Sequence, residues 1–471
     1  MHDDAIAAIL EIVQSSAAAH HAPSVAWGVV RDGALWATGA VGELDDGTTP
    51  SPRTVYRIAS MTKSFTAAAV LALRDDGVLR LDDPITAHAP ELAAVIGPTL
   101  DAATITLGDL LSMSSGLATD DVWADRHLDI TDDELDALMA TGAHFAVDTG
   151  TAFEYSNLGF ALIGRVVLRT TGTPVQQHVS QRFIGPLGLR RTTWTQPDHD
   201  DWARPYRWDA ADDAAGGAHA PESLVGDGAL APMGGIWSCI EDLAVWTDWL
   251  DHAFPARDEP DDGPLRRASR REMQQIHRYA GTRELAGRSA PQGYGYGVLL
   301  RDDPVLGPLA GHSGGLPGYG SNMRWAPGRR LGVIALANVT YAPMAELTLR
   351  IFDALHAAGE VPESSVKVSA TIERLATELV ALLNDWDDAR ADALFTDNVA
   401  LDESYTRRRS AATAVAADNG RFTISSITAL SGAGADVMLT NGAGSYKLEV
   451  ELAPLVPARI ESFSLARIEA N

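Results

Sequence analysis

The sequence predicts an α/β fold with an inserted helical subdomain, followed by a small C-terminal α+β domain. Three observations lead to this prediction. Strand-like patterns occur near both ends of the first 358 residues, and helical patterns fill the segment between them. A separate pattern of one helix and several strands follows a linker-like stretch. The strands from the two ends are therefore expected to form one layer.

The chain has 471 residues, which is too long for one ordinary hydrophobic core, so two or three domains are expected. The stretch "EVPESSVKV" has the composition of a linker. The predicted boundaries are 1–358 for the first domain (α/β part about 1–80 and 285–358, helical part about 81–284), 359–368 for the linker and 369–471 for the second domain.

The first elements follow from the spacing of apolar residues. Ile6, Ile9, Leu10 and Val13 repeat as on one face of a helix. The runs "SVAWGVV" and "GALWATGAVG" are separated by "RDG", which predicts a β-hairpin. "SMTKSFTAAAVLALRDDG" then has the composition of a buried helix that ends at Gly77.

Helical patterns dominate the next stretch, to about residue 285. They are clearest in "TLGDLLSMSSG", "TDDELDALMATG" and "SNLGFALIGRVVLRTTG". Strands return from "QGYGYGVLL" onward, where "GSNMRWAP" and "RLGVIALANVT" predict a strand pair around the turn "PGR". A helix, "APMAELTLRIFDALHAAG", follows and ends at Gly359.

The second domain is predicted to contain one helix and an antiparallel sheet. Ile372, Leu375, Leu379, Leu382 and Trp386 mark one helix face. Four alternating strands follow, "RFTISSITAL", "ADVMLT", "SYKLEVEL" and "ARIESFSLARI", with a hairpin signal at "NG" between two of them. This order is similar to cystatin- or NTF2-like folds. The domain could cover the mouth of an active site or mediate a homodimer.

The formal net charge is −26 and the pI is near 4.8. Such a surface repels nucleic acid and anionic membranes, so neither is expected as a partner. Solubility is the simplest reason for the acidity, and an acidic rim that attracts cationic substrates is the alternative.

The single cysteine, Cys239, excludes an intramolecular disulfide and is expected to be a buried packing residue. His20 and His21 lack further ligand spacing, so no metal is predicted there. The sequence has neither an H-E-x-x-H motif nor a Gly-rich phosphate loop, and no cofactor is predicted. The N-terminus has no basic region before an apolar run, and no stretch is long enough to span a membrane. A cytoplasmic location is the expectation.

Two short stretches compete as the site of a nucleophilic serine. "GHSGG" fits the G-x-S-x-G elbow of α/β-hydrolases around Ser313. However, "GLPGYGS" follows it where a helix is required, and the only later histidine is His356, on a helix expected to face outward. "SMTK" places Ser60 and Lys63 three residues apart at a helix start, on one face.

A serine hydroxyl needs a base beside it, and a lysine serves only when burial or a nearby cation or dipole lowers its pKa. The alternative is that Ser60 caps the helix and Lys63 lies on the surface. Two further stretches favour the catalytic interpretation. "EYSN" supplies Tyr155 and Asn157, and "HSGG" supplies His312 with Gly314 and Gly315.

In this order and at these separations, S-x-x-K, Y-x-N and H-x-G resemble the serine β-lactamase and penicillin-binding protein-like superfamily. The resemblance is strongest to the class C β-lactamase-like branch of esterases, D-aminopeptidases and DD-peptidases, and covers about residues 10–355. It implies a β-lactamase/transpeptidase-like fold, an antiparallel sheet flanked by helices plus a helical subdomain. "GHSGG" then resembles the third motif of the superfamily.

The resemblance also implies the roles of the site residues. Ser60 would be the acylated nucleophile, and Lys63 and Tyr155 would move its proton, in an order that the sequence leaves open. Asn157 would bind Lys63 and the substrate. The N–H groups of Ser60 and Gly315 would form the oxyanion hole. Gly314 lies beside them, in the third motif.

His312 is the departure from the pattern, because β-lactamases usually carry lysine there, which helps to bind a substrate carboxylate. A histidine is neutral over much of the physiological pH range. The sequence therefore favours a serine hydrolase acting on small esters, amides or peptides, including D-amino-acid amides. The alternatives are a β-lactamase or DD-carboxypeptidase, and a non-catalytic scaffold protein.

Aromatic and acidic residues outside the motifs are candidates to line the cleft. Trp123 lies in a loop with Asp120, Asp121 and Asp125, and either lines the cleft or anchors a solvated loop. Trp202, Tyr206 and Trp208 lie in a polar insert and are further cleft candidates. The tryptophans expected instead to pack in the core are Trp237, Trp246 and Trp249.

Overall fold

The computed structural model describes residues 2–210, 216–261, 263–363 and 368–468. Their contacts divide the chain into two compact units, Met1–Pro362 and Glu363–Asn471. Part of the expected linker, residues 364–367, lies outside the described residues. Each unit has its own hydrophobic core and is described by itself.

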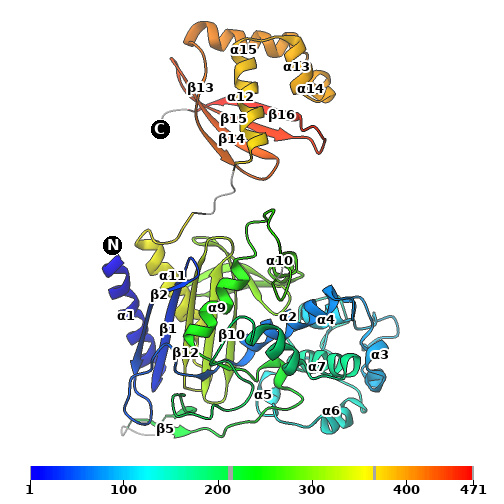
Figure 1. The fold of residues 1–471 in the computed structure, drawn as a ribbon, viewed down its shortest axis with the longest axis vertical. Coiled ribbons are helices and arrows are strands. Elements are labelled where there is room, and N and C mark those ends of the chain that lie inside the picture. Colours follow the sequence, from blue (N-terminus) through cyan, green and yellow to red (C-terminus); the bar gives the residue numbers. More distant parts are fainter. Residues whose placement is uncertain (1, 211–215, 262, 364–367, 469–471) are drawn as a thin grey trace. The chain divides into compact units, whose positions relative to one another are not determined.

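The first unit is built on an eight-stranded antiparallel sheet, which combines strands from both ends of the unit as predicted (Figure 1). In spatial order the strands are β2 (Ala34–Gly42), β1 (Ser24–Arg31), β12 (Leu331–Ala337), β11 (Tyr319–Ala326), β10 (Gly307–Leu316), β9 (Leu299–Asp303), β8 (Arg288–Tyr294) and β7 (Arg278–Leu285).

The first hairpin forms as predicted. Asp32 and Gly33 both have positive φ, the conformation that a two-residue hairpin turn requires. The strands return earlier than expected, because β7 and most of β8 precede "QGYGYGVLL". Few residues of β7 and β8 are buried, and those that are do not alternate regularly with exposed ones, so the pattern that marks a strand is missing.

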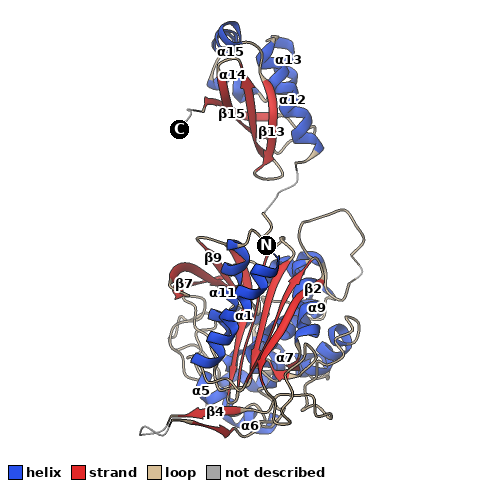
Figure 2. Ribbon diagram, turned by 90° about the vertical axis from the view of Figure 1, so that its left-hand side faces the viewer, coloured by secondary structure: helices blue, strands red, loops and turns tan. Residues whose placement is uncertain are grey.

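Helices cover both faces of this sheet. α1 (His2–Ala19) and α11 (Met344–Ala357) pack on each other and on one face (Figure 2), while α9 (Ile240–Asp251) packs on strands of the other. In α1, Ile9 and Val13 are fully buried, as the apolar spacing predicts. α9 lies in the segment expected to form the helical subdomain, yet it contacts the sheet directly.

The helical region begins with the 3-10 turn η1 (Ala59–Met61) and the buried helix α2, which ends before Gly77 as expected. The short strands within it and the one just before it were not predicted, because each has only two to four residues. The remaining elements are α3 (Ile85–His88), η2 (Pro90–Ala94), α4 (Leu107–Leu111), α5 (Asp121–Ala124), α6 (Asp132–Met139), α7 (Asn157–Thr171), α8 (Val175–Val179), η3 (Ser180–Ile184), η4 (Ala231–Met233) and α10 (Arg267–Met273), with α2 (Thr62–Asp75) and strands β3 (Tyr56–Arg57), β4 (Tyr206–Asp209), β5 (Ala218–Pro221) and β6 (Trp237–Ser238).

In its described residues, 368–468, the second unit has four helices beside its sheet, where the sequence predicted one. The extra helices are short or mostly polar, so they carry no clear apolar stripe. The strands form an antiparallel meander in chain order, with the predicted hairpin at Asn441. The elements are α12 (Ala370–Asn384), α13 (Asp388–Leu394), α14 (Asp397–Asp402), α15 (Tyr405–Asn419), β13 (Thr423–Ala429), β14 (Gly434–Asn441), β15 (Gly444–Leu452) and β16 (Ile460–Arg467).

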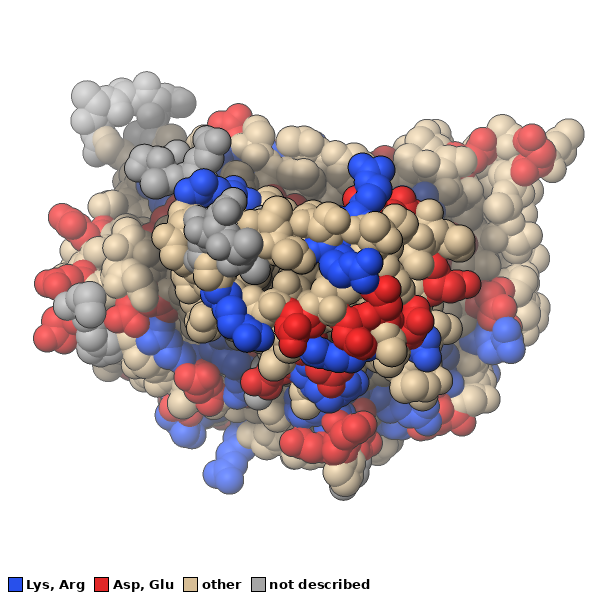
Figure 3. All heavy atoms as spheres, turned by 90° about the horizontal axis from the view of Figure 1, so that it is seen from above, with Lys and Arg blue, Asp and Glu red and all other residues tan. Residues whose placement is uncertain are grey.

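The described helices include none that is both long and apolar enough to cross a membrane. On the face drawn in Figure 3, acidic and basic side chains are interspersed, so the negative net charge is not gathered there into one patch. In the interior of the first unit, the 3-10 turn η1, which leads into α2, packs against β10.

Candidate active site

Ser60 lies in the 3-10 turn η1, directly before α2, and its side chain is almost buried. The preceding residue, Ala59, has φ +48°, in the left-handed region that strains a residue with a Cβ atom. Such outliers persist where the surrounding packing fixes the backbone, and Ala59 is fully packed. The backbone thus holds Ser60 in one position at the edge of a cavity.

This cavity, the cleft, has a volume of about 450 Å³. It combines residues from the helical region, from β10 and from the loop after β12. The residues that line it are Ser60, Asp121, Val122, Asp125, Tyr155, Leu299, His312, Ser313, Gly315 and Tyr341.

Lys63 is fully buried one helical turn after Ser60, as the spacing predicts. Its Nζ donates to Ser60 Oγ at 2.9 Å, to Asn157 Oδ1 at 2.6 Å and to the carbonyl oxygen of Met233 at 2.8 Å. All three acceptors are neutral oxygens. No described carboxylate forms an ion pair with Lys63, so its charge is compensated only at longer range.

The electrostatic setting of Lys63 follows from this burial. Desolvation lowers its pKa to about 8, against the opposing effect of Asp121, Asp125 and Asp120. An ammonium with this pKa releases its proton close to neutral pH. Lys63 therefore has both the contact and the proton affinity that a base for Ser60 requires.

Tyr155 is half-buried above the same lysine, with Lys63 Nζ 5.0 Å from its ring centroid. Burial raises the pKa of its phenol well above the ordinary value, and a hydrogen bond with Ser60 acts in the opposite direction. Tyr155 thus keeps its proton at neutral pH, beside the hydroxyl of Ser60.

Asn157 begins α7 and is fixed on every side. Its Nδ2 donates to Asp121 at 2.7 Å, which turns its Oδ1 toward Lys63. Asp120 accepts from the backbone N–H groups of Asn157 and Leu158, each at 2.7 Å, and so caps the helix start. The two carboxylates set the position of the amide that holds Lys63.

His312 lies on β10 and is buried. Its Nδ1 is 2.6 Å from the carbonyl oxygen of Ser313, so Nδ1 carries the proton and Nε2 accepts from the Tyr294 hydroxyl at 2.9 Å. Burial and the nearby charge of Lys63 lower its pKa to about 3. The histidine is therefore neutral and adds no cation to the cleft.

The two glycines after it let β10 approach the nucleophile. A Cβ atom on Gly314 would lie 2.2 Å from the Ile58 carbonyl oxygen and 2.9 Å from Ala59 Cβ. A Cβ atom on Gly315 would lie 2.7 Å from the ring of Tyr341. Side chains at these two positions would push the strand away from Ser60.

Asp125 and Tyr341 form the acidic end of the cleft. The Tyr341 hydroxyl donates to Asp125 Oδ2 at 3.0 Å. Asp125 is buried, and this burial raises its pKa to about 7. Sequence reasoning missed Tyr341 and the carbonyl of Met233, because neither belongs to a motif and only the folded chain brings them to the site.

The aromatic cleft candidates are placed elsewhere. Trp202 is buried edge-on against Trp237, Trp208 stacks on His21, and Tyr206 donates to Asp45. The prediction that these three line the cleft is therefore wrong. Trp123 is exposed and stacks on His127, although its neighbours Asp121 and Asp125 do line the cleft.

Ser313 lies inside β10 and is followed by the turn into β11, so it is not on a strand-to-helix elbow. Its Oγ accepts from Asn322 Nδ2 at 3.0 Å. His356 is exposed on α11, as expected.

Cys239 is fully buried, which raises its pKa to about 12 and fits a packing role. Among the described residues, no group of three or more His, Cys, Asp or Glu side chains could hold a metal ion.

Comparison with known proteins identifies the family of the chain. The family model described as Beta-lactamase matches residues 9–358. Protein flp of Staphylococcus aureus (strain MW2) is 26% identical over 334 residues, covering 69% of this chain and 61% of that protein. The match thus spans about three fifths of the relative's length. D-alanyl-D-alanine-carboxypeptidase/endopeptidase AmpH of Escherichia coli (strain K12) is 32% identical over 177 residues, 36% of this chain and 45% of AmpH.

Two solved structures share the fold. The octameric penicillin-binding protein homologue from Pyrococcus abyssi has a TM-score of 0.63 and 20% identity, covering 99% of this chain and 96% of its own. A D-stereospecific amidohydrolase from Streptomyces sp. has a TM-score of 0.57 and 24% identity, covering 74% and 97%. The predicted β-lactamase/transpeptidase-like fold is confirmed, and the chain belongs to the beta-lactamase family.

Proposed function

We propose that the chain is a serine hydrolase that cleaves small esters, amides or peptides through an acyl-enzyme on Ser60. The observation that carries the proposal is the contact between Ser60 and a buried lysine that has only neutral oxygen partners. A lysine on the surface would keep its ordinary pKa and could not take the proton of a serine. The family to which the chain belongs supports the same class of reaction.

Acylation begins with the transfer of the Ser60 proton to neutral Lys63. With a pKa of about 8, roughly a tenth of the lysine is neutral at pH 7. Tyr155 is protonated under the same conditions, because burial raises its pKa. We therefore assign the first proton transfer to Lys63, and Ser60 Oγ forms a bond to the substrate carbonyl carbon.

The tetrahedral oxyanion would be held by the N–H groups of Ser60 and Gly315, which both line the cleft. When the bond to the leaving group breaks, the Tyr155 hydroxyl donates its proton to the leaving amine or alcohol, and the Lys63 ammonium returns a proton to Tyr155. Water then attacks the acyl-enzyme by the reverse sequence of proton transfers, which frees the acid and restores Ser60.

The acidic end of the cleft supports substrates that carry an amine on the acyl side. Asp121 and Asp125 line the cleft, and neither forms an ion pair with a described lysine or arginine. A substrate ammonium group would provide that partner. His312 is neutral and does not repel it. This arrangement favours amino-acid amides, esters and small peptides with a free amino group.

The nucleophile is tested by covalent labelling with a fluorophosphonate probe and peptide mapping of the wild type, Ser60→Ala and Ser313→Ala. We expect the label on the Ser60 peptide, lost in Ser60→Ala and kept in Ser313→Ala. Label on Ser313 would refute the assignment. No label on a folded protein would favour the non-catalytic scaffold.

The acyl-side preference is tested with D-alaninamide and N-acetyl-D-alaninamide, which differ in the charge of the amine. We expect kcat/KM to be about tenfold or more higher for D-alaninamide, the size of a charged hydrogen bond. Equal values would refute the role of the carboxylates. The L-forms measure stereoselectivity, which the D-stereospecific relative makes worth testing.

A DD-carboxypeptidase or β-lactamase is the second candidate, supported by the match to AmpH. Hydrolysis of benzylpenicillin, followed by absorbance, separates it from the first. A cytoplasmic location and a homodimer remain predictions from the sequence.

A further inference from the structure

The sequence "GYGYG", residues 293–297, forms the end of β8 and the turn that leads to β9. Its glycines allow close packing against neighbouring main chain. A Cβ atom on Gly295 would overlap the carbonyl oxygen of Met273, and one on Gly297 would overlap the carbonyl oxygen of Lys63. The turn therefore lies directly against α2, at the lysine that contacts Ser60.

Tyr294 reaches from this segment to β10. It is fully buried, and its hydroxyl donates to His312 Nε2 at 2.9 Å. The rings of Phe153 and Tyr155 pack around it, with their centroids 5.9 Å and 6.3 Å from its own. The tyrosine thus links the turn on α2 to the strand that carries the third motif.

His312 extends this contact to the main chain of β10. Its Nδ1 donates to the carbonyl oxygen of Ser313 at 2.6 Å. From His312 onward, β11 is the only described strand that pairs with β10, because the pairing with β9 ends at Gly311. Gly315, whose N–H would hold the oxyanion, lies three residues further along this stretch. The distance of that N–H from Ser60 therefore depends on side chains that hold the unpaired edge.

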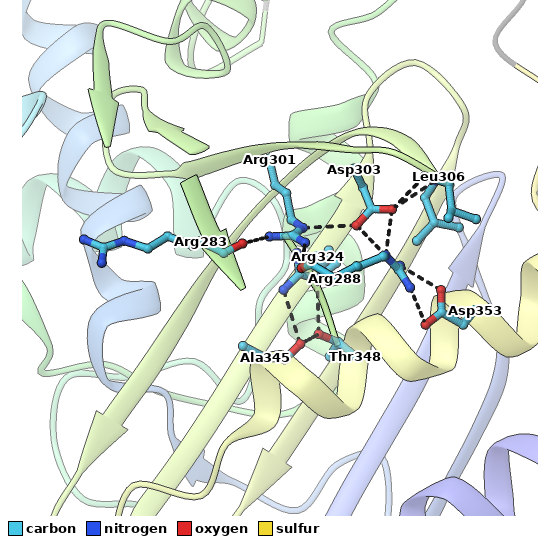
Figure 4. Close-up of polar contacts among 10 residues, drawn as sticks. Arg283, Arg288, Arg301, Asp303, Leu306, Arg324, Ala345, Thr348 and Asp353 are labelled. Carbon is cyan, nitrogen blue, oxygen red and sulfur yellow. Dashed lines mark hydrogen bonds and ion pairs between the residues drawn. The ribbon is translucent and has the colours of Figure 1, made fainter. Parts of the chain in front are cut away.

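The charged groups on the other side of β10 do not hold the imidazole ring. His312 also lines a second cavity, of about 240 Å³, whose wall includes Arg301 and Arg324. Arg301 pairs with Asp303, and Arg324 donates to α11 (Figure 4). Among the described side chains, Tyr294 alone forms a hydrogen bond with the ring of His312. Loss of the Tyr294 hydroxyl would leave the buried Nε2 without a donor, which is costly.

We propose that Tyr294 is a positioning residue that holds the ring of His312 and, through it, the part of β10 that carries the oxyanion donor of Gly315. This inference rests on the proposed function of Ser60. Both ring nitrogens of His312 are engaged within the protein, so the histidine acts on the strand and not on the substrate. Because residues 293–297 also pack on Lys63, one segment sets the distance between the nucleophile and the oxyanion donor.

Tyr294→Phe removes the hydroxyl and keeps the ring. We expect the rate of Ser60 labelling and kcat for D-alaninamide to fall about tenfold with little change in KM, because the oxyanion donor moves while the substrate contacts remain. N-acetyl-D-alaninamide should lose the same factor. A rise in KM for one substrate alone would assign Tyr294 to substrate binding and refute the positioning role.

Tyr56→Phe is the matched control. Tyr56 is also fully buried, and its hydroxyl forms one hydrogen bond of the same length, 2.9 Å, with Ser24 Oγ. We expect this variant to be labelled at the wild-type rate. An equal loss in Tyr56→Phe and Tyr294→Phe would mean that any missing buried hydrogen bond slows the enzyme, which would overturn the proposal.

A double-mutant cycle shows whether Tyr294 acts through His312. His312→Asn keeps an amide donor near the place of Nδ1 and removes Nε2. In this background Tyr294→Phe should change the labelling rate by less than about twofold, because its partner is already missing. A loss that stays about tenfold there would show that the hydroxyl acts on another group, and would also overturn the proposal.

Nuclear magnetic resonance separates the failure of this inference from the failure of the proposed function. Three glycines, Gly217, Gly235 and Gly315, directly follow another glycine in the sequence. Glycine labelled with ¹³C at the carbonyl and with ¹⁵N therefore gives three carbonyl–amide correlations, and Gly314→Ala identifies the one of Gly315 by its loss.

We expect Tyr294→Phe to shift the Gly315 signal by more than those of Gly217 and Gly235. If Ser60 of the wild type is not labelled, the proposed function fails, and this shift still supports the positioning of β10 by Tyr294. A Gly315 signal that Tyr294→Phe leaves in place would refute the inference, whatever the activity of the protein.

Discussion

Lys63 and Arg324 are both buried cations whose hydrogen bonds go to neutral oxygens instead of carboxylates. Burial lowers the pKa of each, to about 8 for the lysine and about 10 for the arginine. The first value lies within reach of neutral pH and the second does not. A similar environment therefore makes one residue a proton acceptor and the other a fixed positive charge.

The largest effect is expected when Lys63 is replaced by arginine, which tests whether Lys63 is the proton acceptor. Lys63→Arg keeps a cation beside Ser60 but removes the neutral form that accepts its proton. We expect labelling of Ser60 by the fluorophosphonate to slow by about 10²–10⁴-fold. Lys63→Met is the matched control without charge and should be similarly slow. Near wild-type labelling in Lys63→Arg would assign the first proton transfer to Tyr155.

The next largest effect concerns the approach of β10 to the nucleophile. Gly314→Ala places a methyl group against the Ile58 carbonyl oxygen and Ala59. We expect kcat/KM to fall about 100-fold because the oxyanion site moves, and stability to fall by about 1–3 kcal/mol. Chemical denaturation and steady-state kinetics measure both.

Gly263→Ala is the matched control for this change. The nearest atom to its new Cβ would be the Leu265 carbonyl oxygen, at an unstrained 3.8 Å. We expect wild-type kinetics from this variant. Wild-type activity in Gly314→Ala would mean that the strand has room to shift without harm to the site.

A smaller effect concerns the pH dependence of Ser60 labelling, which tests the lowered pKa of Lys63. The rate of Ser60 labelling should rise with pH through about 8, because Lys63 is neutral above its pKa. The carboxylate of Asp125 raises that pKa, so Asp125→Asn should move the profile to lower pH. It should also raise KM about tenfold for D-alaninamide.

Asp133→Asn, at an exposed acid on α6, is the control and should leave the profile in place. A profile that is unchanged in Asp125→Asn would show that Asp125 does not interact with the lysine. A labelling rate independent of pH between 6 and 9 would contradict the assignment of the base itself.

The smallest effect is expected at Tyr341. Tyr341→Phe removes one hydrogen bond to Asp125 and leaves the ring against Gly315. We expect KM for D-alaninamide to rise about two- to fivefold with little change in kcat. A large fall in kcat instead would place the Tyr341 hydroxyl in contact with the reacting atoms.

The sequence predicted the parts of the site that depend on short-range spacing. Ser60 and Lys63 meet because they are one helical turn apart, and Asn157 meets Lys63 at the start of a helix that the sequence marks clearly. The layer of strands from both ends of the first unit was also predictable, since each strand has its own apolar pattern.

The other contacts of the site depend on how distant segments of the chain pack together, which a local sequence pattern does not predict. The Met233 carbonyl reaches Lys63 through a turn 170 residues away. Arg324 looks like an ordinary strand residue until its partners on β10 and α11 are known. Trp202 was predicted to line the cleft because the sequence around it is polar, but it is buried against Trp237.

The pairing of β10 has a consequence for substrate tolerance. β9 accompanies it only as far as Gly311, and no described strand pairs with the same edge of His312–Leu316. A peptide substrate of the kind proposed above for Ser60 would add to this edge through its own backbone. Main-chain pairing reads direction and chirality while tolerating many side chains, so inhibitors with an N-methylated backbone should bind poorly even when their side chains fit.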